Sequence, residues 1–241
     1  MTRGASIVPP VTPTTPATAE HSHALERGLR AMEVLRGHPD GLTVTELARE
    51  LGTHRAAVYR VLGPLVAHHL VDRLTDGRCV LGPGLIALAE GVQPRLIEAA
   101  TPVLRALAAS LSATTALTVR DGDEAVVALV FTPPDQPLHV AYRTGLRHPL
   151  TVGSPGHALL AAGPATPGEP PEVATARERG WAVTSGQLLP GATGIAAPVP
   201  ARDRDTQAAV SAVWIVEREL EPAAREVTDA AAAIAAAIGR V

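Results

Sequence analysis

Lysine is absent from this chain of 241 residues, so all 21 of its basic residues are arginine. Without lysine the chain cannot form a Walker phosphate-binding loop or a lysine Schiff base, and both kinds of enzyme site are excluded. Cysteine occurs once, as Cys79. A single cysteine forms neither an intrachain disulfide nor a multi-cysteine zinc site, which favours a reducing compartment such as the cytoplasm.

Aromatic residues make up only 2% of the chain, and no apolar run approaches the roughly 20 residues that cross a bilayer. The core must therefore be built from Ala, Val, Leu and Ile, and we expect no contact with a membrane. Residues 1–22 are rich in Pro and Thr and lack the apolar centre of a signal peptide, which predicts a disordered tail. The remaining length is enough for one large domain or two ordinary ones.

Three helices and a hairpin are predicted between residues 23 and 84. ALERGLRAMEVLRG (24–37) and LTVTELARELG (42–52) repeat apolar residues at helical spacing and stop at glycine, with Thr43 or Thr45 as the cap of the second. The third helix lies in LGTHRAAVYRVLGPL (51–65), and Pro64 is expected to kink it or end it early. In LVDRLTDGRCVLG (70–82), Asp76-Gly77 between two apolar arms predicts a hairpin.

This order of elements is typical of a winged helix-turn-helix, whose third helix enters the DNA major groove with its N-terminal residues. Val58, Val61 and Leu62 form the apolar face of that helix, and the segment contains no carboxylate. Its outer face is small and basic, as contact with base edges and phosphates requires. The predicted DNA-binding residues are Thr43, Thr53, His54, Arg55, Ala56, Tyr59 and Arg60, with Arg73 and Arg78 beside the hairpin turn. The alternative is a solvated basic face, because eight arginines and seven acidic residues lie between His23 and Gly84.

These segments resemble the N-terminal domain of the IclR family of bacterial transcriptional regulators. GLRHPLTVGSPGHALLA (145–161) and RERGWAVTSGQLLPGATGIAAPV (177–199) resemble two later stretches of the same family. The resemblance implies an α+β fold with a winged helix-turn-helix domain at 23–84. It also implies a helical linker and first effector-domain helix at 85–112, and a GAF-like α/β effector-binding domain at 113–241. Such a protein would be a homodimer or homotetramer that binds double-stranded operator DNA, as a repressor, and responds to a small organic effector.

The elements expected in the second half follow from this resemblance and from apolar patterning. Strands are expected at 115–120, 125–131, 138–143, 181–184, 195–200 and 209–216, and helices at 155–163, 171–180 and 221–239. A single helix from Gly84 to Ser112, apolar on more than one face, predicts that a partner chain covers part of it.

The sequence departs from the family at several positions. Ala56 and Ala57 stand where Ser-Thr is common, Cys79 replaces a common wing Tyr, and His157 replaces a Lys. GPATPGEPP (163–171) is expected to be a loop that remodels one wall of the effector pocket.

The effector pocket is expected at Gly153, Ser154, Pro155 and Gly156, where a helix N-terminus offers free N–H groups to a carboxylate. Gly153 and Gly156 would let the ligand approach the backbone. The resemblance places the strand with Ile195 and Ala196 opposite. The alternative is a helix that caps itself with Ser154. The expected polar anchors are Arg143, Arg147, Ser185 and Gln187.

Other chemistry finds little support in the sequence. Ser154 resembles a nucleophile elbow, but Val152 stands where the elbow needs glycine. His21 with His23, and His68 with His69, lack the i, i+4 spacing of metal ligands, so we predict no metal, no cofactor and no catalytic residue. Cys79 is interpreted as a small apolar residue in preference to a redox sensor. Two alternatives remain: a metabolite-binding protein whose DNA-binding half has decayed, suggested by Ala56-Ala57 and Pro64, and a small-molecule enzyme.

Overall fold

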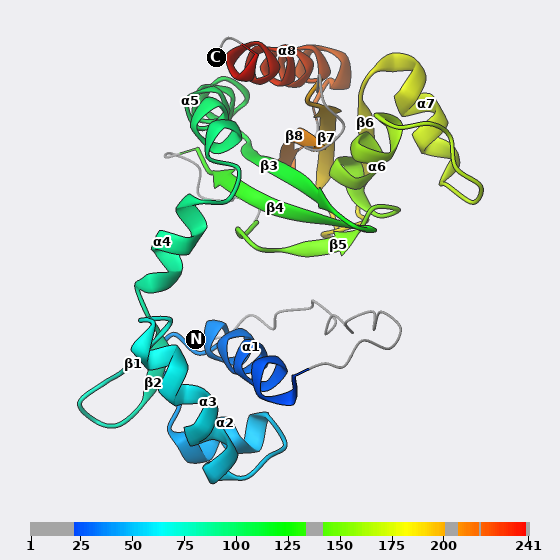
Figure 1. The fold of residues 1–241 in the computed structure, drawn as a ribbon. Helices are drawn as coiled ribbons and strands as arrows, with labels where there is room; N and C mark the ends of the chain where they lie inside the picture. Colours follow the sequence, from blue (N-terminus) through cyan, green and yellow to red (C-terminus); the bar gives the residue numbers. More distant parts are fainter. Residues whose placement is uncertain (1–21, 134–141, 201–206, 217, 240–241) are drawn as a thin grey trace. The chain divides into compact units, whose positions relative to one another are not determined.

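The computed structural model describes residues 22–133, 142–200, 207–216 and 218–239. The chain divides into two compact units, Met1–Val92 and Gln93–Val241, and each is described by itself (Figure 1). Residues 1–21 of the expected tail, and residues 138–141 of one expected strand, lie outside the described residues. In the described part, no helix is long and apolar enough to span a bilayer.

The first unit has the predicted winged helix-turn-helix order. Its elements are α1 (His23–Arg36), α2 (Val44–Glu50), α3 (Arg55–Ala67), β1 (Val71–Arg73), β2 (Cys79–Leu81) and α4 (Gly84–Glu90). The strands β1 and β2 pair antiparallel, and an isolated bridge from Leu42 to Cys79 attaches the segment before α2 to β2. One core joins α1, α2, α3 and the hairpin; its buried residues are Ala31, Leu35, Leu42, Val44, Leu47, Ala48, Leu51, Val58, Leu62, Val71 and Cys79.

Local hydrogen bonds fix the start of α2 and the turn of the hairpin. The Thr43 hydroxyl accepts a hydrogen bond from the Glu46 N–H (3.2 Å), and the Glu46 carboxylate accepts one from the Thr43 N–H (2.8 Å). This reciprocal capping box makes Thr43 the cap of α2, so the alternative cap Thr45 is wrong. At the turn, Gly77 adopts φ +85°, which favours glycine, and confirms the predicted hairpin.

The helix expected to kink or end at Pro64 continues to Ala67. Pro64 and Gly63 lie on the exposed side, whereas Leu65 and Val66 are partly buried against the core of the first unit. The His68 N–H donates to the Pro64 carbonyl at 3.0 Å and closes the last turn. The packing of this last turn therefore offsets the loss of the one backbone hydrogen bond that proline cannot donate.

The second unit is a six-stranded antiparallel sheet with helices on both faces. Its elements are α5 (Pro94–Leu111), β3 (Thr114–Asp121), β4 (Glu124–Phe131), β5 (Arg147–Pro149), α6 (Gly153–Ala161), α7 (Pro171–Arg179), β6 (Ala182–Ser185), β7 (Thr193–Pro198), β8 (Ala208–Trp214) and α8 (Leu220–Ile238). The strand order is β5-β4-β3-β8-β7-β6. Helices α5 and α8 lie on one face, and α6 and α7 lie on the other (Figure 1). Strand β5 was not predicted.

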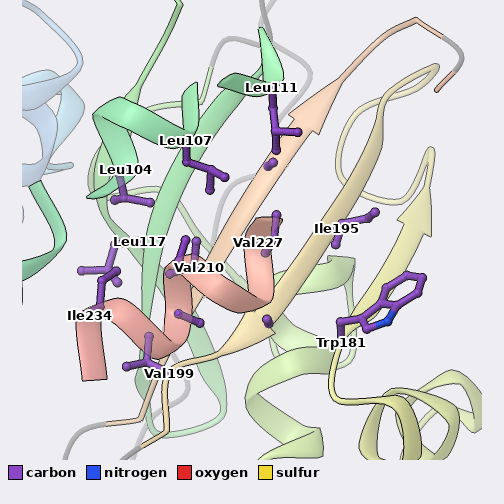
Figure 2. Close-up of a cluster of buried hydrophobic side chains, with 14 of the residues drawn as sticks. Leu104, Leu107, Leu111, Leu117, Trp181, Ile195, Val199, Val210, Val227 and Ile234 are labelled. Carbon is purple, nitrogen blue, oxygen red and sulfur yellow. The ribbon is translucent and has the colours of Figure 1, made fainter. Parts of the chain in front are cut away.

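Most of the apolar packing lies between the sheet and the α5–α8 pair (Figure 2). Leu104, Leu117 and Ile234 are fully buried there, and each such side chain contributes roughly 1.5–3 kcal/mol. Along β7, side chains alternate between the two faces. Ile195 points to the α5–α8 side, whereas Ala196 belongs to a second cluster beneath α6.

The single helix expected from Gly84 to Ser112 is wrong, because the chain breaks between α4 and α5. Gly91 caps α4, Gln93 adopts a left-handed conformation (φ +46°, ψ +52°), and Pro94 starts α5. A residue before proline avoids the right-handed helical conformation, which explains the break at Gln93. The division between the two units falls at the same place.

Candidate functional site

The outer face of α3 is exposed and carries no acidic side chain. His54, Arg55, Ala56, Tyr59 and Arg60 are exposed, and Thr53, just before the helix, is partly exposed. Within the described residues, the side chains of Arg55 and Arg60 form no hydrogen bond and no ion pair. Both guanidinium groups therefore remain available to an external anion such as a phosphate.

The hairpin contributes one more cation beside this face. The Arg73 guanidinium lies 5.2 Å from the centroid of the Tyr59 ring, within the range of a cation–π contact. Arg73 is exposed on β1 and Tyr59 on α3, so the contact brings the hairpin and the helix surface together. Arg73 and Tyr59 can then act on one ligand.

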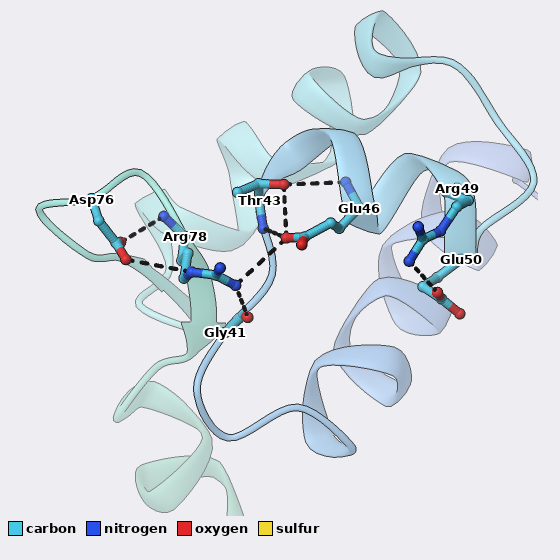
Figure 3. A network of polar contacts seen from close by, with 7 residues as sticks. All are labelled: Gly41, Thr43, Glu46, Arg49, Glu50, Asp76 and Arg78. Atoms are coloured by element: carbon cyan, nitrogen blue, oxygen red, sulfur yellow. Dashed lines mark hydrogen bonds and ion pairs between the residues drawn. The ribbon is translucent and has the colours of Figure 1, made fainter.

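Thr43 and Arg78, two other predicted DNA contacts, are already engaged within the fold (Figure 3). The Arg78 guanidinium donates to the Gly41 carbonyl (2.9 Å) and lies 3.5 Å from the Glu46 carboxylate and 3.4 Å from that of Asp76. The Thr43 N–H and hydroxyl both donate to Glu46, and these bonds lower the pKa of the Glu46 carboxyl, with smaller help from Arg78. The network ties the hairpin to the start of α2.

The structure places two of the departures from the family pattern, Ala57 and Cys79, in the core of the first unit. Ala57 is buried in the first unit, so a hydroxyl there would not reach a ligand, and only Ala56 changes the outer face. Cys79 is fully buried, and this burial raises the pKa of its thiol, with Arg73 acting in the opposite direction. A buried thiol that resists ionisation fits an apolar role better than a redox role.

In the second unit, the N-terminus of α6 does not cap itself with Ser154. The cap residue is Val152, and it supplies no side-chain hydrogen bond. Instead the Gly153 N–H donates to the Gln187 side-chain oxygen (2.7 Å), and the Ser154 N–H donates to the Thr184 hydroxyl (2.9 Å). Pro155 has no N–H. Side chains from the β6–β7 hairpin therefore occupy the donors that were expected to be free.

A small cavity of about 20 Å³ lies beside this helix terminus, enough for roughly one water molecule. One hydroxyl group in its wall, that of Tyr142, is buried and has no hydrogen-bond partner among the described residues, and Ser154, a residue 1% exposed, lies in the same wall. Burial raises the pKa of the Tyr142 phenol above its ordinary value. The lining residues are Tyr142, Ser154, Thr184, Gln187, Leu188, Leu189, Ala192, Gly194 and Val213.

The structure gives different places to the other predicted effector contacts. A Cβ at Gly156 would lie 2.9 Å from the Leu150 carbonyl carbon, so this glycine permits packing of the chain on itself and leaves no room for a ligand. Ile195 faces α5 and α8, on the opposite side of the sheet. Pro155, within α6, and Ala196, beneath that helix, are buried and do not line the cavity.

The expected polar anchors are also dispersed. Arg143 is exposed and does not line the cavity, and Arg147 forms ion pairs with Asp121 and Glu124. Ser185 bonds to Thr193 (2.9 Å) and borders an open hollow of about 530 Å³ on the α8 side of the sheet. Gln187 is the one predicted anchor that lines the cavity.

The shortened segment 163–171 also lies apart from the cavity lining. It is irregular, as expected, and Arg177 of α7 fastens it through Glu169 (2.8 and 3.0 Å) and the Gly163 carbonyl (3.1 Å). In the described part, no three His, Cys, Asp or Glu side chains gather as a metal site requires. His21 lies outside that part.

The sequence indicated Gly194, as part of the strand opposite the pocket, but not Tyr142, Thr184 or Leu188. Thr184 and Gly194 are paired residues of β6 and β7, so recognition of that hairpin register was the available signal. Tyr142 follows residues that the structure does not describe, and no pattern indicates where its side chain lies.

Comparison with known proteins agrees with both units. The sequence model of the IclR helix-turn-helix domain matches residues 24–74, and that of the C-terminal domain of the bacterial transcriptional regulator IclR matches residues 92–169. The HTH-type transcriptional regulator Rv1719 of Mycobacterium tuberculosis is 34% identical over 141 residues, 58% of this chain and 54% of that protein. The HTH-type transcriptional regulator TtgV of Pseudomonas putida is 31% identical over 141 residues, which again are 58% of this chain and 54% of that protein. The match thus spans about half the length of these curated relatives.

A solved IclR homolog from Microbacterium hydrocarbonoxydans, complexed with 4-hydroxybenzoate, has a similar fold. Its TM-score is 0.80 at 24% identity, and the match covers 90% of this chain and 100% of that one. Together the two domain models cover more than half of the sequence. The chain therefore belongs to the IclR family of bacterial transcriptional regulators.

Proposed function

We propose that this protein is a transcriptional regulator, and not an enzyme, which binds double-stranded operator DNA and responds to a small organic effector. One observation carries the proposal: α3 presents two unpaired guanidinium groups, Arg55 and Arg60, on an exposed face without carboxylates. In a helix-turn-helix, the N-terminal part of this helix enters the major groove. A regulator of this kind acts on DNA in the cytoplasm, and we propose repression as its mode.

The proposed DNA-binding surface consists of Thr53, His54, Arg55, Ala56, Tyr59, Arg60 and Arg73. Arginine reads guanine through its two parallel donors, or pairs with phosphate. Thr43 and Arg78 then have a supporting role, because their polar groups hold the hairpin against α2. Arg73 would reach the DNA backbone from the hairpin, beside Tyr59.

The proposed effector site is the N-terminus of α6 with the hydroxyl groups of Ser154 and Tyr142. A helix N-terminus favours an anion by roughly 0.3–1 kcal/mol when exposed, and by more when it is partly buried. The Tyr142 hydroxyl, which is buried without a partner, and the Ser154 hydroxyl would bind the same ligand. Since the Microbacterium homolog carries 4-hydroxybenzoate, a small aromatic or aliphatic carboxylate is the ligand class that we propose here.

The proposed assembly is a homodimer or homotetramer in which α4 contacts a second chain. None of the seven residues of α4 is buried in the described structure, and the large apolar side chains of Ile86 and Leu88 are 68% and 62% exposed. Nearby, Val92 is 62% exposed. Apolar side chains concentrated in this way on one short segment are typical of an interaction surface.

A metabolite-binding protein without DNA-binding activity is the second candidate. The sequence suggested it because of Ala56-Ala57 and Pro64. Ala57 is buried and α3 continues through Pro64, so only Ala56 still favours this candidate.

A salt series of DNA-shift measurements on the DNA that flanks the gene tests the proposal. We expect binding that weakens steeply with salt. Arg60→Ala should cost about 1–3 kcal/mol if Arg60 contacts a base, or lower the salt slope by about one if it contacts a phosphate. Arg225→Ala, an exposed arginine of α8, is the matched control and should bind like the unsubstituted protein. Equal DNA binding by the Arg60 and Arg225 variants would show that Arg60 of α3 does not contact DNA. If neither variant nor the unsubstituted protein bound DNA, the second candidate would be favoured.

A further inference from the structure

The turn between β6 and β7 folds back onto the N-terminus of α6. We call residues 186–191, of sequence GQLLPG, the tip segment. Its Gln187 accepts the hydrogen bond of the Gly153 N–H at 2.7 Å. Its Leu188 fills the space in front of Gly153, since a Cβ at that glycine would lie 2.8 Å from Leu188 Cγ. An amide oxygen thus occupies the place where the oxygen of a carboxylate ligand would sit.

The space that remains beneath the tip segment is too small for an organic acid. The cavity of about 20 Å³ accommodates roughly one water molecule, yet its wall holds the hydroxyl groups of Ser154 and Tyr142, and that of Tyr142 is buried without a partner among the described residues. Buried polar groups without partners are uncommon in folded proteins, because each costs free energy. These hydroxyl groups are placed to bind a molecule larger than the present cavity admits.

We propose that the tip segment is a built-in competitor of the effector, which it excludes from the N-terminus of α6 until it moves away. This inference rests on the ligand site of the proposed function. A ligand carboxylate would replace the Gln187 oxygen at the Gly153 N–H and accept hydrogen bonds from the two hydroxyl groups. The bond of Ser154 N–H to Thr184 comes from β6 itself and remains.

The ends of the tip segment can act as hinges. Gly186 and Gly191 adopt φ +71° and +78°, and a Cβ at either position would meet no atom within 4 Å. Between them, Gln187, Leu189 and Pro190 are exposed. The Gly186 N–H donates to the Ala192 carbonyl (2.8 Å) and the Ala192 N–H to the Leu189 carbonyl (3.1 Å), but both bonds lie within the hairpin, so the contacts of Gln187 and Leu188 with Gly153 hold the segment against α6. The apparent affinity for the effector is lowered by the fraction of molecules in which the segment is closed. Weakening the closed state must therefore strengthen ligand binding.

Calorimetric titration with benzoate, a carboxylate on an apolar ring, tests the competition. We expect Leu188→Ala and Gln187→Ala to bind benzoate several-fold to about tenfold more tightly than the unsubstituted protein. Leu220→Ala, which removes a half-exposed leucine elsewhere in the same unit, is the matched control and should not change the affinity. Gln187 is exposed, so its substitution leaves the fold intact even if that of Leu188 does not. Hydrogen exchange at the Gly153 N–H should accelerate in Gln187→Ala.

Unchanged or weaker benzoate binding by both tip variants would overturn the proposal, because the segment would then be a wall of the site or irrelevant to it. Absence of benzoate binding by every protein would also overturn it. DNA binding is measured separately. If DNA binding is present but benzoate affinity does not respond to the tip variants, only the competition fails. If the tip variants gain affinity but no protein binds DNA, the regulator function fails and the competition stands.

Discussion

The guanidinium of Arg78 donates a hydrogen bond of 2.9 Å to the carbonyl oxygen of Gly41, although 37 residues separate the two in sequence. The same guanidinium approaches Glu46 and Asp76, so one side chain joins the loop before α2, the α2 capping box and the hairpin turn (Figure 3). A basic residue at the edge of a candidate DNA surface is thus used to hold that surface together.

Arg78→Ala should lower the stability of the first unit. One net hydrogen bond is worth roughly 0.5–1.5 kcal/mol, and the partly exposed ion pairs add little. Chemical unfolding of the variant, followed by circular dichroism, measures the loss. Arg30→Ala removes an exposed arginine of α1, in the same unit, and serves as the control. If Arg78→Ala weakened DNA binding with no loss of stability, Arg78 would be a DNA contact in its own right.

Gly156→Ala should destabilise the second unit, because the new Cβ would be forced against the carbonyl group of Leu150. Overpacking of this kind typically costs about 1–3 kcal/mol. Gly163→Ala is the control, since its Cβ would be 3.6 Å from the nearest atom, an ordinary contact. Equal melting temperatures of the two variants would contradict the prediction. A substitution at Gly156 is therefore a test of packing, and ligand binding has to be tested elsewhere.

The sequence predicted the helices and the hairpin of the first unit because their signals are local. Helical spacing, the Thr43–Glu46 capping box and Asp76-Gly77 act within a few residues of each other. The position of Pro64 misled the prediction, since the packing of Leu65 and Val66 decides where α3 ends. Tertiary contact overrides local preference at such positions.

The candidate effector cavity was predicted less well, because its lining depends on which face of the sheet each residue occupies. Ser154 and Gln187 were identified, but Ile195 was assigned to the wrong face, one residue away from Gly194. A shift of one residue in a strand exchanges the faces. The occupation of the Gly153 N–H by Gln187, 34 residues later, has no local signal.

The stability of the second unit should fall as the pH decreases below about 6.5. Burial lowers the pKa of His148 from its ordinary value of 6.5, with His157 acting in the same direction and Glu124 and two backbone hydrogen bonds opposing. The unfolded chain, whose histidine keeps its ordinary pKa, then binds more protons than the folded one, so the free energy of unfolding rises with pH in this range. His148→Gln should flatten the dependence, whereas the exposed His23→Gln should not. If the stability of His148→Gln still falls at low pH, other titrating groups cause the pH dependence.

Charged substitutions on α4 should dissociate the assembly. Ile86 and Leu88 are largely exposed in the single chain, and a carboxylate at either position would be buried without a partner in an interface. Light scattering should show a dimer or a larger species for the unsubstituted protein and a monomer for Ile86→Glu with Leu88→Glu. Leu189→Glu, in the second unit, is the control and should keep the assembly. If the unsubstituted protein is a monomer at micromolar concentration, the proposed homodimer or homotetramer is contradicted.

Tyr142→Phe should separate the folding and the ligand-binding roles of the cavity. The Tyr142 hydroxyl is buried without a partner, so its removal should leave stability unchanged or raise it slightly, because an unsatisfied polar group is lost. Benzoate affinity should nevertheless fall, by roughly tenfold, since a hydrogen bond to a charged group is worth about 1.5–3 kcal/mol. Tyr59→Phe, at the exposed tyrosine of α3, is the matched control and should alter neither quantity. Melting temperature and calorimetric titration, measured on the same samples, give the answer. A loss of stability without a change in benzoate affinity would show that Tyr142 serves packing alone, and the ligand would then have to contact the α6 terminus without it.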